Sequence, residues 1–541
     1  MNEKEIYVYF SEKVYNDGES DITVSTPRSI PLTEGMSLYD ALREGGITLS
    51  APCAGNGTCG ACKIKLLEGS LSISQKDKQQ LSDEQLKEGW RLSCQAYPTE
   101  SCRIYVLSEE YVAVTGYVNG NKDDSGRIAA GDRPMSLHDS RSQCGQYGIA
   151  IDLGTTTLAY ELFDINTGNT VRTVSSANPQ RIYGADVVSR MEQSDNGRRD
   201  QLKFTLRQGM KKDIIELLHD IEPAKVQAIA ISGNTAMLHL LMGYSCEGLG
   251  RYPFRPATLD HIHTDAVELN LMDRSVPLFI TGGISAYVGG DVLVGIAAQK
   301  IMSEKEPCLF IDLGTNAEMA LFDGKGKIYV TSAPAGPAFE AANISCGVGS
   351  IEGAVSGISI QNGQQTLITI GKKEPLGFCG SGILEAVYEL LANQIIDDTG
   401  LLEETYFEIG YPVEKLRITQ QDIRQIQLAK SAVFSAIHLL MKKAEVTICD
   451  IKKVYLAGGF GYHLNVKKAV GIGLLPEKFS DKIQAVGNTS LYGSKGILMG
   501  EITENGLNEI KNICEEIYLS NENDFQSIFM ENMNFKRKYE T

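Results

Sequence analysis

The sequence predicts a chain of several domains, in which a small α+β domain precedes a larger, internally duplicated α/β domain. Three observations lead to this fold class. The chain has 541 residues, more than a single ordinary domain contains. Four cysteines form a close pattern within the first 94 residues. Further along, one strand–turn–strand pattern occurs twice, 160 positions apart, as expected for two similar subdomains.

The net charge and the apolar pattern of the chain argue against some classes of binding partner and cellular location. The formal net charge of −17 argues against nucleic acid and against an anionic membrane surface, because both attract basic patches. The N-terminal Met1–Glu5 has no basic and apolar signal pattern, and the apolar stretch 276–298 is interrupted by Asp291 and several glycines. We therefore expect a cytoplasmic protein with no membrane span. In that compartment cysteines are thiols or metal ligands more often than disulfides.

The cysteine pattern predicts an iron–sulfur centre. Cys53, Cys59 and Cys62 form C-x5-C-x2-C in a glycine-rich loop, and Cys94 follows 32 positions later. Four thiolates can hold a [2Fe–2S] cluster, and the glycines let backbone N–H groups turn toward the sulfurs. Structural zinc is the alternative, although only one cysteine pair has the usual knuckle spacing. The other eight cysteines are scattered, and we expect buried thiols and no second cluster.

The flanking segments predict the fold around these cysteines. Residues 5–10, 21–26 and 63–67 have the pattern of strands, and Ser37 is placed to cap a short helix ending near Leu42. Residues 1–107 resemble a plant- or adrenodoxin-type ferredoxin, with the first five-residue gap of the adrenodoxin branch. The resemblance implies a β-grasp domain with Cys53, Cys59, Cys62 and Cys94 as cluster ligands.

A change of composition follows this domain. From about Thr115 to Gln146 the chain is rich in Gly, Asn and Asp and has no apolar periodicity. Such a segment is typical of a linker. We assign residues 108–146 to a mobile linker that lets the cluster domain move.

The repeated pattern predicts a phosphate site. Each copy contains an apolar strand, an Asp-Leu-Gly-Thr turn beginning at Asp152 or Asp312, and a second strand. Glycine lets the turn approach a phosphate, threonine donates to it, and aspartate can hold Mg²⁺ through water. A third element is the Ala-Gly-Gly turn at Gly458, which can pack against adenine or ribose. The predicted catalytic residues are Asp152 and Asp312, and the predicted nucleotide-binding residues are Gly154, Thr155, Thr156, Thr157, Gly314, Thr315, Asn316, Gly458 and Gly459.

No P-loop motif occurs in the chain. The order of two phosphate hairpins and a diglycine turn resembles the superfamily of acetate and sugar kinases, heat-shock cognate proteins and actin, over roughly residues 147–500. The resemblance implies two ribonuclease-H-like subdomains that clamp ATP with Mg²⁺ between them. It places an ATPase domain at 147–541, with a C-terminal tail from about residue 500.

The combination of a ferredoxin domain and this ATPase resembles the reductive activators of corrinoid proteins. Supporting strings are residues 178–190, 282–291 and 335–340. The resemblance implies an enzyme that uses ATP to transfer one electron from its [2Fe–2S] cluster to inactive Co(II) corrinoid, giving Co(I). Its implied partner is the corrinoid protein of a methyltransferase system, and the electron donor is not identified. A homodimer is a possible assembly.

Other functions stay open at this point. A small-molecule ATP kinase with a regulatory ferredoxin domain would need a general base, for which Asp312 or Glu318 is a candidate. A non-enzymatic, redox-sensing nucleotide switch would share the same motifs. An activator that injects electrons into a dehydratase resembles the ATPase half, but usually has a cluster shared between subunits.

Overall fold

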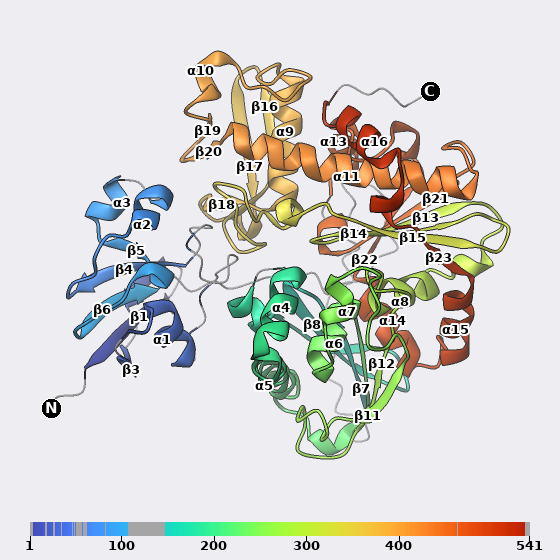
Figure 1. The fold of residues 1–541 in the computed structure, drawn as a ribbon, viewed down its shortest axis with the longest axis horizontal. Helices are drawn as coiled ribbons and strands as arrows, with labels where there is room; N and C mark the ends of the chain where they lie inside the picture. The colour runs from blue at the N-terminus through green and yellow to red at the C-terminus, as the bar shows by residue number, and fades with distance from the viewer. Residues whose placement is uncertain are drawn as a thin grey trace. The chain divides into compact units, whose positions relative to one another are not determined.

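The computed structural model describes residues 4–16, 19–24, 27–33, 35–45, 47, 49, 57, 62–81, 83–106, 146–184, 186–462 and 464–535. The chain forms two compact units, coloured along the chain in Figure 1. The first comprises residues 1–110 and 177–206, and the second comprises 111–176 and 207–541. Except for Gln146, the predicted linker 108–146 lies outside the described residues, as do Cys53 and Cys59.

The first unit is built around a six-stranded mixed sheet in the order β2–β1–β6–β4–β5, with β3 also paired to β1. Strands β1 and β6 run parallel, whereas β4 pairs antiparallel with β5 and β6. Alternate residues such as Ile6, Ile64 and Ile104 are completely buried, as the period of a strand requires. The sheet confirms the predicted ferredoxin fold. Its strands are β1 (Glu5–Asn16), β2 (Glu19–Val24), β3 (Arg28–Pro31), β4 (Lys63–Glu68), β5 (Trp90–Leu92) and β6 (Cys102–Val106).

Helix α1 (Leu38–Glu44) covers this sheet, and its start is confirmed as predicted. Ser37 accepts a hydrogen bond from the N–H of Asp40 at 3.1 Å, and Leu38 and Leu42 are fully buried. The shorter helices α2 (Gln75–Gln80) and α3 (Asp83–Lys87) follow β4. The first unit also contains α4 (Val187–Gln193) and the start of α5 (Arg199–Leu217).

The second unit contains two sheets of the same design. One has the order β11–β12–β10–β7–β8–β9, and the other β22–β21–β13–β14–β15–β23. In each sheet, the first strand of an antiparallel hairpin (β7 with β8, β13 with β14) also pairs in parallel with the next strand of the sheet, which pairs in parallel with a further one. These parallel strands are β10 and β12 in the first sheet, and β21 and β22 in the second. This confirms the duplicated subdomains. The bounds are β7 (Tyr147–Leu153), β8 (Thr157–Asp164), β9 (Thr170–Ala177), β10 (Val226–Gly233), β11 (Ile262–Asp265), β12 (Pro277–Ile280), β13 (Cys308–Leu313), β14 (Ala317–Phe322), β15 (Ile328–Ala333), β21 (Lys453–Ala457), β22 (Ile483–Gly487) and β23 (Cys514–Glu516).

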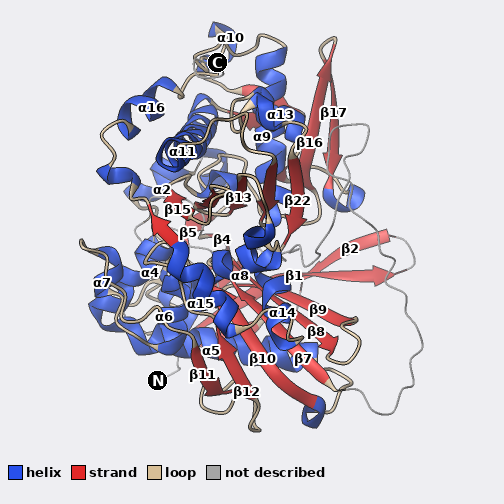
Figure 2. Cartoon of the chain, turned by 90° about the vertical axis from the view of Figure 1, so that its right-hand side faces the viewer, coloured by secondary structure: helices blue, strands red, loops and turns tan. Residues whose placement is uncertain are grey.

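Two helices link these sheets. Helix α8 (Gly290–Ala298) packs against α14 (Thr489–Leu498), and the two lie side by side in Figure 2. Glycines allow the close approach, because a Cβ at Gly493 would lie 2.6 Å from Cβ of Val294. A Cβ at Gly295 would meet the ring of Phe310 in β13 at the same distance, 2.6 Å. The helices therefore join the cores of both halves.

The remaining elements extend the second half. Helices α9 (Gly380–Ala392) and α11 (Gln420–Ala444) carry its core, beside a sheet of β16 (Ala354–Gln361), β17 (Gln364–Thr369) and β18 (Gly377–Phe378). Beyond residue 500, β23 pairs in parallel with β15, so this part of the chain completes the second sheet. The second half also contains α10 (Glu404–Phe407), β19 (Tyr411–Val413), β20 (Leu416–Ile418), α12 (Gly459–Tyr462), α13 (Val466–Gly471), α15 (Glu504–Ile513) and α16 (Phe525–Glu531). Helices α6 (Thr235–Met242) and α7 (Glu247–Gly250) belong to the first half, between β10 and β11.

Within the described part of the chain, every helix is too short or too polar to span a lipid bilayer.

Candidate nucleotide and cluster sites

Four half-buried acidic side chains lie near enough in the second unit for their charges to interact. Asp152 and Asp312 lie at the carboxyl ends of the equivalent strands β7 and β13, and Glu318 lies directly opposite Asp312 on β14. Asp291 comes from the first turn of α8. The charges of Asp152 and Asp291 both act on Asp312, so the fold brings the two predicted catalytic aspartates together. The duplicated strand ends thus build one acidic site.

Burial dominates the electrostatics of this site. Burial first, and then the negative charges of Asp291 and Asp152, together raise the pKa of Asp312 to about 8. Burial likewise raises the pKa of Asp291 to about 7 and that of Glu318 well above its usual value. The pKa of Asp152 is also raised by burial, but the hydrogen bond that Asn488 donates to its carboxylate opposes the shift. A divalent cation nearby would stabilise the ionised forms of these carboxyl groups.

Side chains from distant parts of the chain hold the first hairpin. Asn488, which caps α14, donates from Nδ2 to Oδ2 of Asp152 at 2.8 Å. Asn234, which caps α6, donates from Nδ2 to the hydroxyl of Thr155 at 3.0 Å. The turn between β7 and β8 is therefore fixed at Asp152 and Thr155 by two helix caps.

The predicted glycines line the same region. Gly458 lies against the second hairpin, because a Cβ there would be 2.6 Å from Oδ1 of Asp312. Its φ of 88° also requires glycine. At Gly459 an added Cβ would meet no atom within 4 Å, and at Gly314 only the carbonyl of Asn316, at 3.7 Å. These two glycines leave open space of the kind that a nucleotide's phosphates or ribose would fill.

The residues fit MgATP better than a bare metal ion. Among the described residues, no group of three or more His, Cys, Asp or Glu side chains is close enough to hold a metal directly. Mg²⁺ usually keeps several waters and takes one or two carboxylates together with substrate phosphates. Asp152 and Asp312 would hold it in that way, while the hairpin threonines Thr155, Thr156 and Thr315 would donate to phosphate. Bound MgATP supplies a hydrolysable phosphoanhydride.

In the first unit, two of the four predicted cluster ligands can be placed. The sulfurs of Cys62 and Cys94 lie 3.3 Å apart, and both side chains are buried. Their hydrogen bond lowers the pKa of Cys62 to about 6, which favours the thiolate that iron requires. Two adjacent, buried thiols, of which Cys62 has a lowered pKa, fit a [2Fe–2S] cluster, which supplies one low-potential electron. Cys53 and Cys59 lie outside the described residues.

The sequence analysis missed several residues of the nucleotide region. Asp291, Asn234, Asn488 and Glu340, which accepts a hydrogen bond from Thr156, were not assigned to it, although Asn234 and Asn488 each directly follow a strand. Asp291 and Glu340 lie in strings that supported the resemblance, so a local signal existed for them. Asn234 and Asn488 look like ordinary helix caps, and only their second hydrogen bonds connect them with the hairpin.

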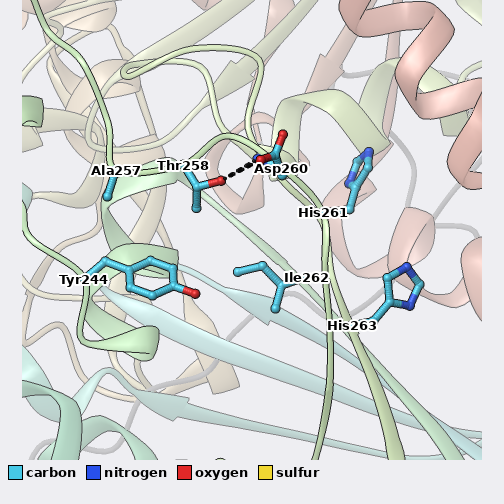
Figure 3. Close-up of a pocket in the computed structure, with 7 residues that line it drawn as sticks. All are labelled: Tyr244, Ala257, Thr258, Asp260, His261, Ile262 and His263. Atoms are coloured by element: carbon cyan, nitrogen blue, oxygen red, sulfur yellow. Dashed lines mark hydrogen bonds between the residues drawn. The ribbon is translucent and has the colours of Figure 1, made fainter.

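A separate pocket of about 390 Å³ opens on the second unit (Figure 3). It is lined by Tyr244, Ala257, Thr258, Asp260, His261, Ile262 and His263, none of them in the hairpins. His261 accepts from the N–H of Gly282 through Nδ1 at 3.0 Å, and burial lowers its pKa. The acidic site, with its matching hairpins, remains the better candidate for chemistry.

Three family models together match most of the chain. Residues 22–99 match a 2Fe–2S iron–sulfur cluster binding domain, and residues 147–304 match the RACo middle region. Residues 306–541 match the C-terminal domain of RACo, described as the ASKHA domain.

Individual relatives agree with these matches. The corrinoid activation enzyme RamQ of Eubacterium limosum is 30% identical over 72% of this chain and 70% of its own length. The [Co(II) methylated amine-specific corrinoid protein] reductase of Methanosarcina barkeri is 24% identical over 65% of this chain and 70% of its own. The solved structure of a reductive activator for a corrinoid, iron–sulfur protein shares the fold, with a TM-score of 0.67 and 24% identity over 98% of both chains.

Proposed function

The chain belongs to the family of reductive activators of corrinoid proteins, and on that basis we propose that it uses ATP to reduce protein-bound Co(II) corrinoid to Co(I). One electron would leave the [2Fe–2S] cluster of the N-terminal domain. ATP would be hydrolysed between the duplicated hairpins, with Asp152 and Asp312 positioning Mg²⁺ and the attacking water.

One observation carries this proposal: a single chain joins a buried pair of cluster cysteines to an acidic site between two phosphate hairpins. Cys62 and Cys94 share a hydrogen bond in the first unit. In the second unit, the negative charge of Asp152 raises the pKa of Asp312. A kinase needs no electron carrier, and a ferredoxin alone needs no ATP site, so the combination favours ATP-driven electron transfer.

The physical reason for using ATP is the low potential of the product. Plant-type clusters have potentials of about −400 mV, and the Co(II)/Co(I) couple is expected to lie lower. For a one-electron step, each 59 mV or so of uphill transfer lowers the equilibrium constant about tenfold. ATP can help only if it favours a complex in which Co(II) is easier to reduce, or in which return of the electron is blocked.

We further propose a corrinoid protein of a methyltransferase system as the partner and the cytoplasm as the compartment. The partner is supported by the relative from Methanosarcina barkeri, whose name gives a methylated amine-specific corrinoid protein as its substrate. The compartment is supported by the absence of a bilayer-spanning helix from the described residues. We propose a homodimer as the assembly.

The test is an anaerobic mixture of the full-length protein, titanium(III) citrate, MgATP and a Co(II) corrinoid protein, followed by absorbance. We expect Co(I) to form with MgATP and much more slowly with MgADP. Rapid reduction without nucleotide would identify a simple ferredoxin instead. A phosphorylated metabolite in place of Co(I) would identify a kinase.

A matched pair of variants tests the role of the cluster. Cys62→Ser should abolish Co(I) formation while MgATP binding persists. Cys102→Ser is the control, because Cys102 is also buried in the first unit, where burial raises its pKa to about 11. If both variants retain iron, labile sulfide and activity, the assignment of Cys62 is wrong.

A further inference from the structure

The segment after β15 crosses from the second half of the ATPase to the first hairpin. It contains the 3₁₀ helix Pro337–Glu340, part of the string 335–340 that the function above leaves without a role. Oε2 of Glu340 accepts a hydrogen bond from the hydroxyl of Thr156 at 2.8 Å. Thr156 is in the turn between β7 and β8, 184 positions earlier in the chain. One carboxylate thus connects the two halves at a predicted phosphate-binding residue.

The rest of this segment contacts the other motifs of the nucleotide site. The ring of Phe339 stacks on Phe460, with centroids 4.8 Å apart and an interplanar angle of 20°. Phe460 directly follows the diglycine turn Gly458–Gly459. The carbonyl of Phe339 lies so close to Gly380, at the start of α9, that a Cβ there has no space. The backbone position of Glu340 is therefore set by its neighbours.

Further along, the segment connects with the longest helix of the second half. Ser345 donates to Asp422 from its N–H at 2.7 Å and from its hydroxyl at 2.6 Å. Asp422 is buried and belongs to the capping box at the N-terminus of α11. A displacement of Glu340 would consequently act on a segment anchored at α11.

The hydroxyl of Thr156 can donate a hydrogen bond to only one acceptor at a time. A threonine hydroxyl has a single proton to donate, and in this structure Glu340 accepts it. A nucleotide phosphate at the first hairpin would compete for the same proton. Its negative charge would also repel the Glu340 carboxylate at close range.

We propose that Glu340 competes with the nucleotide for the first hairpin: it holds the hydroxyl of Thr156 until a phosphate takes that donor. Binding of a phosphate at Thr156 is then coupled to release of the segment that follows Glu340. The inference rests on the proposed function, since it needs a nucleotide phosphate to reach Thr156. It adds a route by which the occupied hairpin changes the contacts of the second half.

The test is equilibrium binding of Mg²⁺ and the non-hydrolysable analogue AMP-PNP to the full-length protein, by calorimetry under anaerobic conditions. Glu340→Gln removes the charge while keeping the side-chain shape. A neutral acceptor holds the hydroxyl roughly half as strongly, so we expect about tenfold tighter binding. In steady-state ATPase assays the same variant should lower KM for ATP and change kcat little. A purely structural role would weaken binding instead.

A double-mutant comparison tests whether the gain acts through Thr156. In a Thr156→Val background, which has no hydroxyl, the gain from Glu340→Gln should fall at least threefold. Glu374→Gln is the control for lost surface charge, because Glu374 is exposed and forms an ion pair with Lys415 at 3.5 Å. It should leave the affinity unchanged.

The outcomes separate this inference from the function on which it rests. If the wild-type protein does not bind Mg²⁺ and AMP-PNP, both are wrong. If it binds and Glu340→Gln is neutral, weaker, or equally improved in the Thr156→Val background, only the role of Glu340 is overturned.

Discussion

The two phosphate hairpins share the turn sequence Asp-Leu-Gly-Thr but have different surroundings. At the first, Asp152 receives a hydrogen bond from Asn488 at 2.8 Å, which opposes the effect of burial on its pKa. At the second, Asp312 lies beside Asp291 and Asp152, and burial with these neighbours raises its pKa to about 8. The difference arises from side chains outside both copies of the motif.

This difference separates the roles of the two aspartates. The hydrogen bond from Asn488 favours the ionised form of Asp152, which suits a carboxylate that orients Mg²⁺ and its water. A carboxylate with a raised pKa is the stronger base, which suits Asp312 to accept a proton from the attacking water. Carboxyl groups whose environments shift their pKa differently are typical of divided catalytic work.

The largest expected effect is on ATP hydrolysis by Asp312→Asn. Loss of a group that accepts a proton in the transition state should lower kcat by about 10²–10⁴-fold. Asp152→Asn is the matched variant, and we expect a smaller loss of about 10–100-fold, mainly through weaker Mg²⁺ binding. Phosphate release measured against Mg²⁺ concentration separates the two. Equal losses in kcat, with no change in the Mg²⁺ requirement, would contradict the division of roles.

A smaller effect is expected from Asn488→Ser. Serine still caps α14, but is too short to donate to Asp152, so the pKa of Asp152 should rise. The acidic limb of the pH profile of kcat should move to higher pH, and the apparent Mg²⁺ affinity should fall about tenfold. Thermal unfolding provides the control, because an intact cap should keep the midpoint near that of the wild type. An unshifted acidic limb would mean that Asn488 does not tune Asp152.

A few-fold effect is expected from Asn234→Ser, which removes the donor to Thr155 but keeps a cap on α6. The net contribution of one neutral hydrogen bond, about 1 kcal/mol, predicts a KM for ATP raised roughly two- to tenfold. Asn234→Ala should show the same kinetic change and lose about a further 1 kcal/mol of stability with the cap. If only the alanine variant raises KM, the defect belongs to the helix and not to Thr155.

The smallest effect concerns stability against pH. The pKa of Asp312 is raised from 3.8 to about 8 in the folded protein. Between these values the folded protein keeps a proton that the unfolded chain releases, so the free energy of unfolding contributed by this group falls as pH rises. Asp312→Asn should therefore raise the thermal midpoint by a few degrees more at pH 8 than at pH 5. The measurement is made with EDTA and without nucleotide, since bound Mg²⁺ would stabilise the carboxylate. A larger increase in the thermal midpoint at pH 5 than at pH 8 would contradict the predicted direction of the pH dependence.

The sequence alone determined the local parts of this protein. Ser37 identified the start of α1, and the Asp-Leu-Gly-Thr turns identified two hairpins that the structure confirms. Such features depend on residues a few positions apart, whose conformational preferences act directly on the backbone. The same locality made the duplication and the family resemblance recognisable, because each motif is contained in a short stretch of chain.

Tertiary structure decided what surrounds those parts. Asp291 joins the acidic site because α8 starts at the end of the first sheet, and Asn488 reaches Asp152 across 336 positions. Glu340 accepts a hydrogen bond from Thr156, which lies 184 positions earlier in the chain. A pKa near 8 at Asp312 depends on burial and on the charges of distant residues, and neither quantity is present in a local motif. The two hairpins could therefore be recognised as alike from the sequence, whereas their unlike chemistry follows from contacts that only the folded chain creates.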